Sequence, residues 1–180
     1  MKIIRLDPGE LFIGTVPAEV HTVLGSCVSI TFYHSRLRQG AICHARKPAH
    51  HCPRSHSGLK ICRELGDHVQ CSLEFMLAWF DHKGVSRQEL EVKLFGGGMM
   101  FSTLPVSMEN PMLNMGKRNI DTAMAFIRAS RLHLTASDVS GPWARQIVFY
   151  TDSGEIKLKR IRKSAQELER LERLGRLENL

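Results

Sequence analysis

Short stretches of alternating apolar and polar residues, rich in β-branched types, constrain this chain more than any other feature. Alternation with a period of two places every second side chain on one face of a sheet, so each stretch predicts a strand. Three such stretches lie in the first quarter of the chain and two near its other end: residues 20–23, 28–33, 40–44, 146–151 and 155–161. The last two flank Asp152-Ser153-Gly154, a turn sequence that predicts a β-hairpin.

Two segments between these strands repeat their apolar residues with the period of a helix. The first predicts an amphipathic helix over residues 62–82, ended by Gly84. Its apolar face consists of Val69, Leu73, Met76, Leu77 and Phe80. The second helix is predicted to begin near Asn119, as its N-cap, and to end around Ser130. Two further strands are predicted over residues 89–95 and 132–135.

The length of 180 residues suits one domain whose core can bring distant side chains together. Ser164 and Glu167 form a capping-box pattern ahead of leucines at helical spacing. We therefore expect one domain over residues 1–163 and a C-terminal amphipathic helix over residues 164–180.

Residues 1–13 include charged side chains among the apolar ones and so lack the apolar core of a signal peptide. No later run is long enough to span a bilayer, so we expect a cytoplasmic protein without membrane insertion. The five cysteines, an odd number, are then expected to be reduced thiols rather than disulfides.

The formal charge of +7 favours an acidic partner surface, which could be protein, nucleic acid or lipid headgroup. Much of the excess positive charge lies in one basic run, and such a run is usually a solvent-exposed face. It consists of Lys157, Lys159, Arg160, Arg162 and Lys163. The run lacks the interleaved aromatic residues of a nucleic-acid platform, so no nucleic acid is expected.

Cys27 follows the tight connection Leu24-Gly25-Ser26 at the start of a predicted strand, and His44 falls at the end of the next strand. A thiol beside a glycine-containing turn can project from a strand end, where backbone N–H groups can point at a developing oxyanion. An imidazole within reach would remove the thiol proton and later protonate a leaving amine. On residue types alone the opposite reading stays open, because a cysteine on a strand is often a small buried hydrophobe and the histidine a satisfied core residue.

A family resemblance favours the catalytic reading. Leu24-Gly25-Ser26-Cys27-Val28 resembles the LGSCV signature of the chemoreceptor glutamine deamidases, the CheD family, and His44 stands where that family has its catalytic histidine. Lys93-Leu94-Phe95-Gly96-Gly97-Gly98 is similar to the family's glycine turn, and the segment from Asn114 to Asn119 to its N-x-G-x-R-N helix entry.

The resemblance implies a fold, an activity and partners. The fold would be a single-domain layered α/β sandwich of mainly antiparallel or mixed sheets with two long flanking helices, related to the cytotoxic necrotizing factor toxins. The activity would be deamidation of glutamines on the cytoplasmic helices of methyl-accepting chemotaxis receptors by a Cys-His-Thr triad without a cofactor. Methylester hydrolysis at the same positions is chemically feasible as a side activity. A CheC-type phosphatase is a possible further partner.

The third member of the triad is less clear than the other two. Thr22 is the candidate, while His21 occupies the neighbouring position. A slip of one residue on a strand reverses the face that a side chain occupies, so only one of them can meet His44. The sequence Ala45-Arg46-Lys47-Pro48 also departs from the apolar family pattern, and its basic character favours an acidic receptor surface.

Other readings of the sequence compete with the enzyme. The chain could be a non-catalytic module that docks on receptors or on a CheC-type phosphatase. The His- and Cys-rich stretch over residues 50–71 suggests zinc but lacks C-x-x-C and H-x-x-x-H pairs, so no metal is expected. Ser26 lacks the G-x-S-x-G elbow of a serine nucleophile, and Gly96-Gly97-Gly98 lacks the lysine of a phosphate loop.

Overall fold

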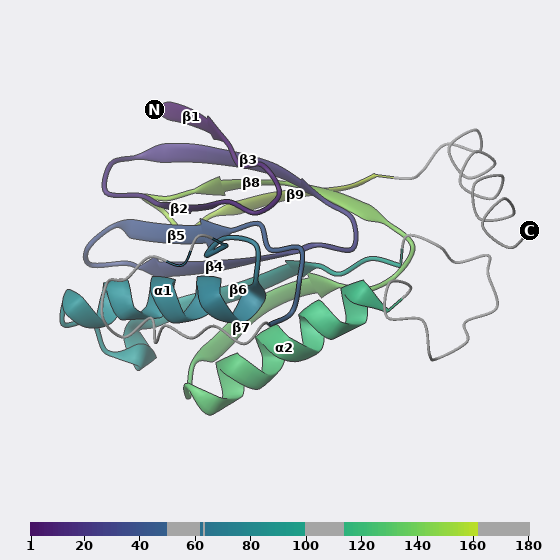
Figure 1. The fold of residues 1–180 in the computed structure, drawn as a ribbon. Coiled ribbons are helices and arrows are strands. Elements are labelled where there is room, and N and C mark those ends of the chain that lie inside the picture. Colours follow the sequence, from purple (N-terminus) through teal and green to yellow (C-terminus); the bar gives the residue numbers. More distant parts are fainter. Residues whose placement is uncertain (50–61, 63, 100–113, 162–180) are drawn as a thin grey trace, which may run out of the picture.

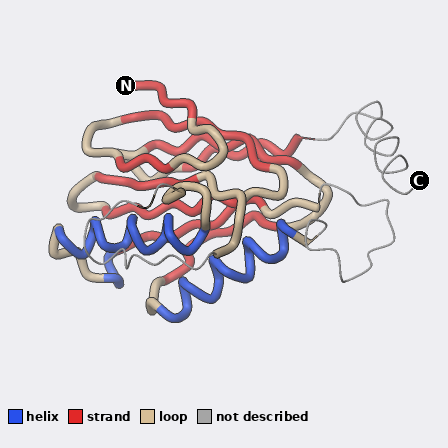
Figure 2. The backbone as a smooth tube through the Cα atoms, viewed as in Figure 1, coloured by secondary structure: helices blue, strands red, loops and turns tan. Residues whose placement is uncertain are grey.

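A computed structural model describes residues 1–49, 62, 64–99 and 114–161 of the chain. These residues form three layers: a four-stranded sheet, a five-stranded sheet, and two helices that cover the free face of the five-stranded sheet (Figure 1). We call the first the outer sheet and the second the inner sheet. The two helices lie on the same side of the strands (Figure 2).

The outer sheet has the strand order β1-β3-β8-β9. It comprises β1 (Lys2–Arg5), β3 (Ala18–Leu24), β8 (Ala144–Tyr150) and β9 (Ile156–Ile161). β1 runs parallel to β3, and the other pairs are antiparallel. β8 and β9 form the predicted hairpin, with Gly154 at a φ of +72° in the left-handed region that a glycine adopts without strain.

The inner sheet has the strand order β2-β5-β4-β6-β7. It comprises β2 (Leu11–Ile13), β5 (Gln39–Cys43), β4 (Val28–His34), β6 (Leu90–Gly96) and β7 (His133–Val139). Only β6 and β7 pair in parallel. The central strand β4 is buried along its whole length, because the helices cover one of its faces and the outer sheet covers the other.

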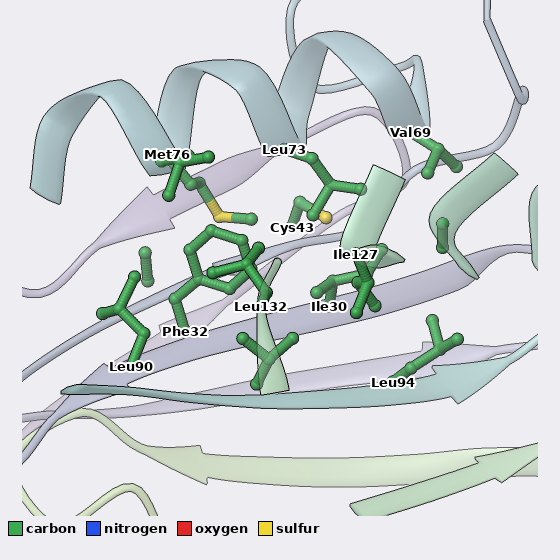
Figure 3. Packing of buried hydrophobic residues seen from close by; sticks show 14 of the residues in the cluster. Ile30, Phe32, Cys43, Val69, Leu73, Met76, Leu90, Leu94, Ile127 and Leu132 are labelled. Carbon is green, nitrogen blue, oxygen red and sulfur yellow. The ribbon is translucent and has the colours of Figure 1, made fainter. Parts of the chain in front are cut away.

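Two helices and one short 3-10 helix complete the described fold: α1 (Val69–His82), α2 (Met115–Ala129) and η1 (Arg87–Glu89). Val69, Leu73 and Met76 of α1 point at Ile30 and Phe32 of β4 (Figure 3). These side chains are fully removed from water, and burying an aliphatic or aromatic side chain of this size contributes about 1.5–3 kcal/mol each.

A second, smaller cluster fills the space between the two sheets. It consists of Leu6, Ala18, Val20, Leu24, Ile42, Phe95, Ile147 and Phe149. Cys27 packs against this cluster and not against the helix side of the inner sheet. The predicted class, a single-domain layered α/β sandwich with mixed sheets and two long helices, is therefore confirmed; kinship with the necrotizing factor fold stays a prediction.

The predicted strands all exist, but both helix starts were wrong. α1 begins at Val69 rather than at residue 62, because His68 bridges to Lys47 and the Val69 N–H donates to the Lys47 carbonyl (2.8 Å), which ties the preceding chain to an extended segment. α2 begins at Met115, so Asn119 lies inside the helix and is not its N-cap.

Strands β1 and β2 were missed, since three or four residues are too few for a visible alternation. The predicted C-terminal helix over residues 164–180 and most of the His- and Cys-rich stretch lie outside the described residues.

Candidate active site

Cys27 lies between β3 and β4, and the glycine turn at the end of β6 packs directly against it. The Gly97 N–H donates to the Cys27 carbonyl (2.7 Å), and the Gly98 N–H donates to the Gly25 carbonyl (2.8 Å). Gly96 has no room for a side chain, since a Cβ there would run into the Cys27 carbonyl. The glycine run is thus a structural turn that fixes the backbone of the candidate nucleophile.

The same turn leaves the Cys27 N–H without a backbone acceptor in the described part of the chain. Continued antiparallel pairing would have turned the Gly97 carbonyl toward that N–H. Gly97 instead has a φ of +63°, and its carbonyl faces α2, where a Cβ on Gly116 would lie 2.6 Å from the oxygen. The Cys27 N–H helps to lower the pKa of its own thiol, although burial raises that pKa overall. An N–H without a backbone acceptor can donate to the oxygen of a carbonyl group that the sulfur attacks.

The strand register places His44 on the same face of the inner sheet as Cys27. Val28 and Ala45 lie opposite each other and exchange both backbone hydrogen bonds (3.0 and 2.9 Å). Cys27 is therefore opposite Arg46, and Ser29 is opposite His44. Residues opposite each other share a face, so this register makes Cys27 and His44 diagonal neighbours on one face of the inner sheet. This face looks toward the outer sheet.

Thr22 reaches His44 from the outer sheet. Its Oγ1 lies 2.7 Å from His44 Nδ1 and donates a hydrogen bond to the Leu6 carbonyl (2.8 Å). A threonine hydroxyl has one proton, so with that proton on Leu6 it accepts the second bond from a protonated Nδ1. The other ring nitrogen, Nε2, is then the unprotonated one and can accept a proton from a thiol.

His21 lies on the opposite face of β3. Residues Val20, Thr22 and Leu24 are buried between the sheets, whereas the His21 side chain is 34% exposed and its Nε2 lies 3.4 Å from Glu19 Oε2. Of the two residues considered for the third position, the structure brings only Thr22 to His44.

Burial keeps the candidate pair in its neutral form. It raises the pKa of the Cys27 thiol above its ordinary value, against the opposing effects of the Arg46 guanidinium and of the Cys27 N–H. It lowers the pKa of the His44 imidazole, against the opposing effects of the Leu6 carbonyl and the Asp7 carboxylate. At neutral pH the resting site therefore holds a thiol and a neutral imidazole rather than an ion pair.

A cluster of charges borders the site. Asp67 bonds Arg46 through its Oδ1 and lies 2.8 Å from Lys47 Nζ through its Oδ2. Burial alone would raise the pKa of Asp67, but the hydrogen bonds and charges of Arg46 and Lys47 lower it overall. Two cations thus share one carboxylate at the border of the site. Sequence reasoning noted both basic residues but missed Asp67, which lies far from them in the chain.

A pocket of about 380 Å³ opens on the Thr22 side of the imidazole. Its lining includes Thr22 and His44 but not Cys27: Arg5, Leu6, Asp7, Pro8, His21, Thr22, Val23, His44 and Gln146. His44 is only 2% exposed, so the pocket ends against a buried side chain.

Asn119 is the residue at this site that the sequence analysis misjudged. It is fully buried on α2, and its Nδ2 donates to the carbonyls of Ser26 (3.2 Å) and Arg46 (2.9 Å). Its position in a helical repeat gave no sign of these contacts, which join segments distant in sequence.

The described residues contain no group of three or more His, Cys, Asp or Glu side chains that could hold a metal ion. Among the helices within these residues, none combines the length and apolar character needed to cross a membrane.

Comparison with known proteins places this geometry in a family context. Residues 53–160 match the family model described as "CheD chemotactic sensory transduction". The chain is 38% identical over 161 residues to the probable chemoreceptor glutamine deamidase CheD 2 of Geobacter sulfurreducens, covering 89% of this chain and 91% of that protein. It is 37% identical over 167 residues to the probable chemoreceptor glutamine deamidase CheD of Maridesulfovibrio salexigens, covering 91% and 94%.

A third relative, the probable chemoreceptor glutamine deamidase CheD of Pseudomonas syringae pv. tomato, is 34% identical over 156 residues, covering 87% and 88%. The family model begins after the candidate site, but an alignment over 89% of the chain extends across Cys27 and His44. With a family model that matches more than half of the chain and relatives that align over almost all of it, this protein belongs to the CheD family.

Proposed function

We propose that the chain deamidates glutamine side chains of chemoreceptors to glutamates, with Cys27 as nucleophile, His44 as general acid and base, and Thr22 as the residue that orients the imidazole. The relatives named above carry the substrate class in their names. The observation that carries the residue assignment is the hydrogen bond between Thr22 and His44 Nδ1, on the face that Cys27 shares.

The first half of the reaction forms a thioester. The Cys27 thiol gives its proton to His44 Nε2 as the sulfur attacks the carboxamide carbon of the glutamine. The carbonyl oxygen becomes an oxyanion, to which the Cys27 N–H donates. The imidazolium then protonates the nitrogen, the C–N bond breaks and ammonia leaves. Because the resting pair is neutral, proton transfer accompanies the attack instead of preceding it.

The second half hydrolyses the thioester. His44, again neutral, takes a proton from water as the water oxygen attacks the thioester carbon, and returns it to the departing sulfur. Thr22 keeps Nδ1 protonated throughout, so that Nε2 performs every transfer. The product carries a new carboxylate, which changes the charge of the receptor helix. No cofactor takes part in these steps.

The experiment is mass spectrometry of a receptor cytoplasmic fragment after incubation with the purified full chain. Wild-type protein should convert glutamines to glutamates, and Cys27→Ala should not. Cys43→Ala is the matched control, because Cys43 is a buried thiol on the opposite, helix-facing side of the inner sheet. Continued conversion by Cys27→Ala would remove Cys27 from the mechanism. Binding without conversion by the wild type would favour the non-catalytic module.

Docking on a CheC-type phosphatase and methylester hydrolysis stay predictions of the family resemblance. Both can be examined with the same variants, since docking would survive Cys27→Ala and ester hydrolysis would not.

A further inference from the structure

The two chain segments that flank Cys27 separate at the nucleophile. The pairing of β4 with the chain after β5 ends with Val28 and Ala45. If the register continued, Ser26 and Lys47 would form the next hydrogen-bonded pair. The Lys47 N–H instead donates to the Asp67 carbonyl (3.0 Å). The next pair of backbone hydrogen bonds between the two segments is thus missing beside Cys27, where the thiol must be held in place.

The Asn119 side chain bridges this gap. Its Nδ2 uses its two protons on the carbonyls of Ser26, the residue before Cys27, and Arg46, the residue opposite Cys27. The orientation of the amide is fixed, because a flipped amide would set its oxygen against two carbonyl oxygens. One side chain from α2 therefore replaces the missing contact between the two segments.

The amide oxygen of Asn119 indicates that the two Nδ2 hydrogen bonds are the contribution of this residue. Its Oδ1 is buried and has no hydrogen-bond partner within the described residues. A buried polar atom without a partner destabilises a fold, so an apolar residue would suit this helix position better if packing alone mattered. The position carries an amide with two donors, and both donors are used next to Cys27.

We propose that Asn119 is a positioning residue for the deamidation reaction: by tying the Ser26 and Arg46 carbonyls together, it holds the thiol against His44 and keeps the Cys27 N–H aimed at the oxyanion. The proposal rests on the function proposed above. Asn119 does not touch the substrate, and it acts through the backbone on both sides of the nucleophile.

The test compares two variants of the full chain with a matched control. Asn119→Leu has a similar volume and removes both donors. Asn119→Ser leaves one hydroxyl proton and serves if the leucine variant does not fold. Ser72→Ala is the control, because it removes a buried hydroxyl on the other helix that donates to the Leu65 carbonyl (2.9 Å).

Two readouts separate positioning from simple stability. The first is deamidation per folded molecule, for which kcat should fall by about 10²-fold in the Asn119 variants, with KM within about threefold, as expected for a misplaced reacting group. The second is alkylation of Cys27 by iodoacetamide as a function of pH, followed by peptide mass spectrometry. A released turn admits more water, so the alkylation midpoint should move to lower pH. Ser72→Ala should change neither quantity.

Unchanged kcat and an unchanged alkylation midpoint in the folded Asn119 variants would overturn the proposal and leave Asn119 as a structural residue. The alkylation measurement needs no receptor. It therefore reports on Asn119 even if the wild-type chain proves not to deamidate receptors, and the two proposals can fail separately.

Discussion

Replacing Thr22 by valine tests the imidazole orientation most directly. Valine has nearly the shape of threonine, and Thr22 is only 5% exposed, so the change removes one buried hydroxyl. That hydroxyl now bonds both His44 Nδ1 and the Leu6 carbonyl. Without it, a buried carbonyl loses its donor and a buried ring N–H loses its acceptor.

The magnitude follows from those two bonds. A buried group left unpaired costs about 1–3 kcal/mol, so Thr22→Val should lower the free energy of unfolding by about that amount or somewhat more. The bond to Nδ1 also selects the tautomer with a free Nε2. Loss of a preference of about 1.4 kcal/mol corresponds to a factor of about ten, and disorder of the ring adds to it. We expect kcat to fall by at least about tenfold.

The assay is deamidation of a receptor fragment at saturating concentration, with chemical denaturation to measure stability. His21→Ala is the paired variant, because His21 is the neighbouring residue on the opposite face of β3. Its kcat should stay within about twofold of the wild type, as expected for a surface change. Equal loss in both variants, or no loss in Thr22→Val, would refute the assignment of Thr22 as the orienting residue.

Three further outcomes follow from the geometry of the site. Arg46→Met removes the cation that lowers the pKa of the Cys27 thiol, so the pH midpoint of Cys27 alkylation should rise. A fall of that midpoint would contradict this role of Arg46. The neutral thiol and neutral imidazole coexist above the lowered pKa of His44 and below the raised pKa of Cys27. The pH profile of kcat/KM should therefore show a broad plateau, whose acid limb lies below the ordinary imidazole pKa of about 6.5. An acid limb above that value would disagree with the burial of His44. Gly97→Ala places a Cβ against the Ile120 side chain at a φ of +63°, so it should lower both the thermal unfolding midpoint and kcat. Gly84→Ala is the control: its φ of +70° also disfavours alanine, but the Cβ meets open space, so only the unfolding midpoint should fall.

Much of the fold was predictable because its strands carry local patterns. In β3, β4 and β5, successive side chains point to opposite faces of the sheet, both buried or one buried and one facing solvent. The turn Asp152-Ser153-Gly154 has the residues that a hairpin needs. Helix starts were not predictable to the same degree. α1 begins late because its N–H groups pair with Lys47 and Pro48, which lie some twenty residues earlier, and no local pattern records such a contact.

The candidate site divides in the same way. The sequence by itself offered the candidates: Cys27 beside a glycine-containing turn, His44 at the end of the neighbouring strand, and a glycine run similar to that of the family. These features are local, since they depend on residue type, strand period and short spacing. The family resemblance favoured the catalytic reading over that of buried core residues.

Only the tertiary structure decided how these residues meet. It brought Thr22 rather than His21 to the imidazole, because the face that a strand residue occupies depends on the register of a sheet packed against another sheet. It also placed Asn119 and Asp67 next to the chain around Cys27 from segments far along the chain. Hydrogen bonds between distant segments depend on how the layers pack, and the sequence holds no local trace of them.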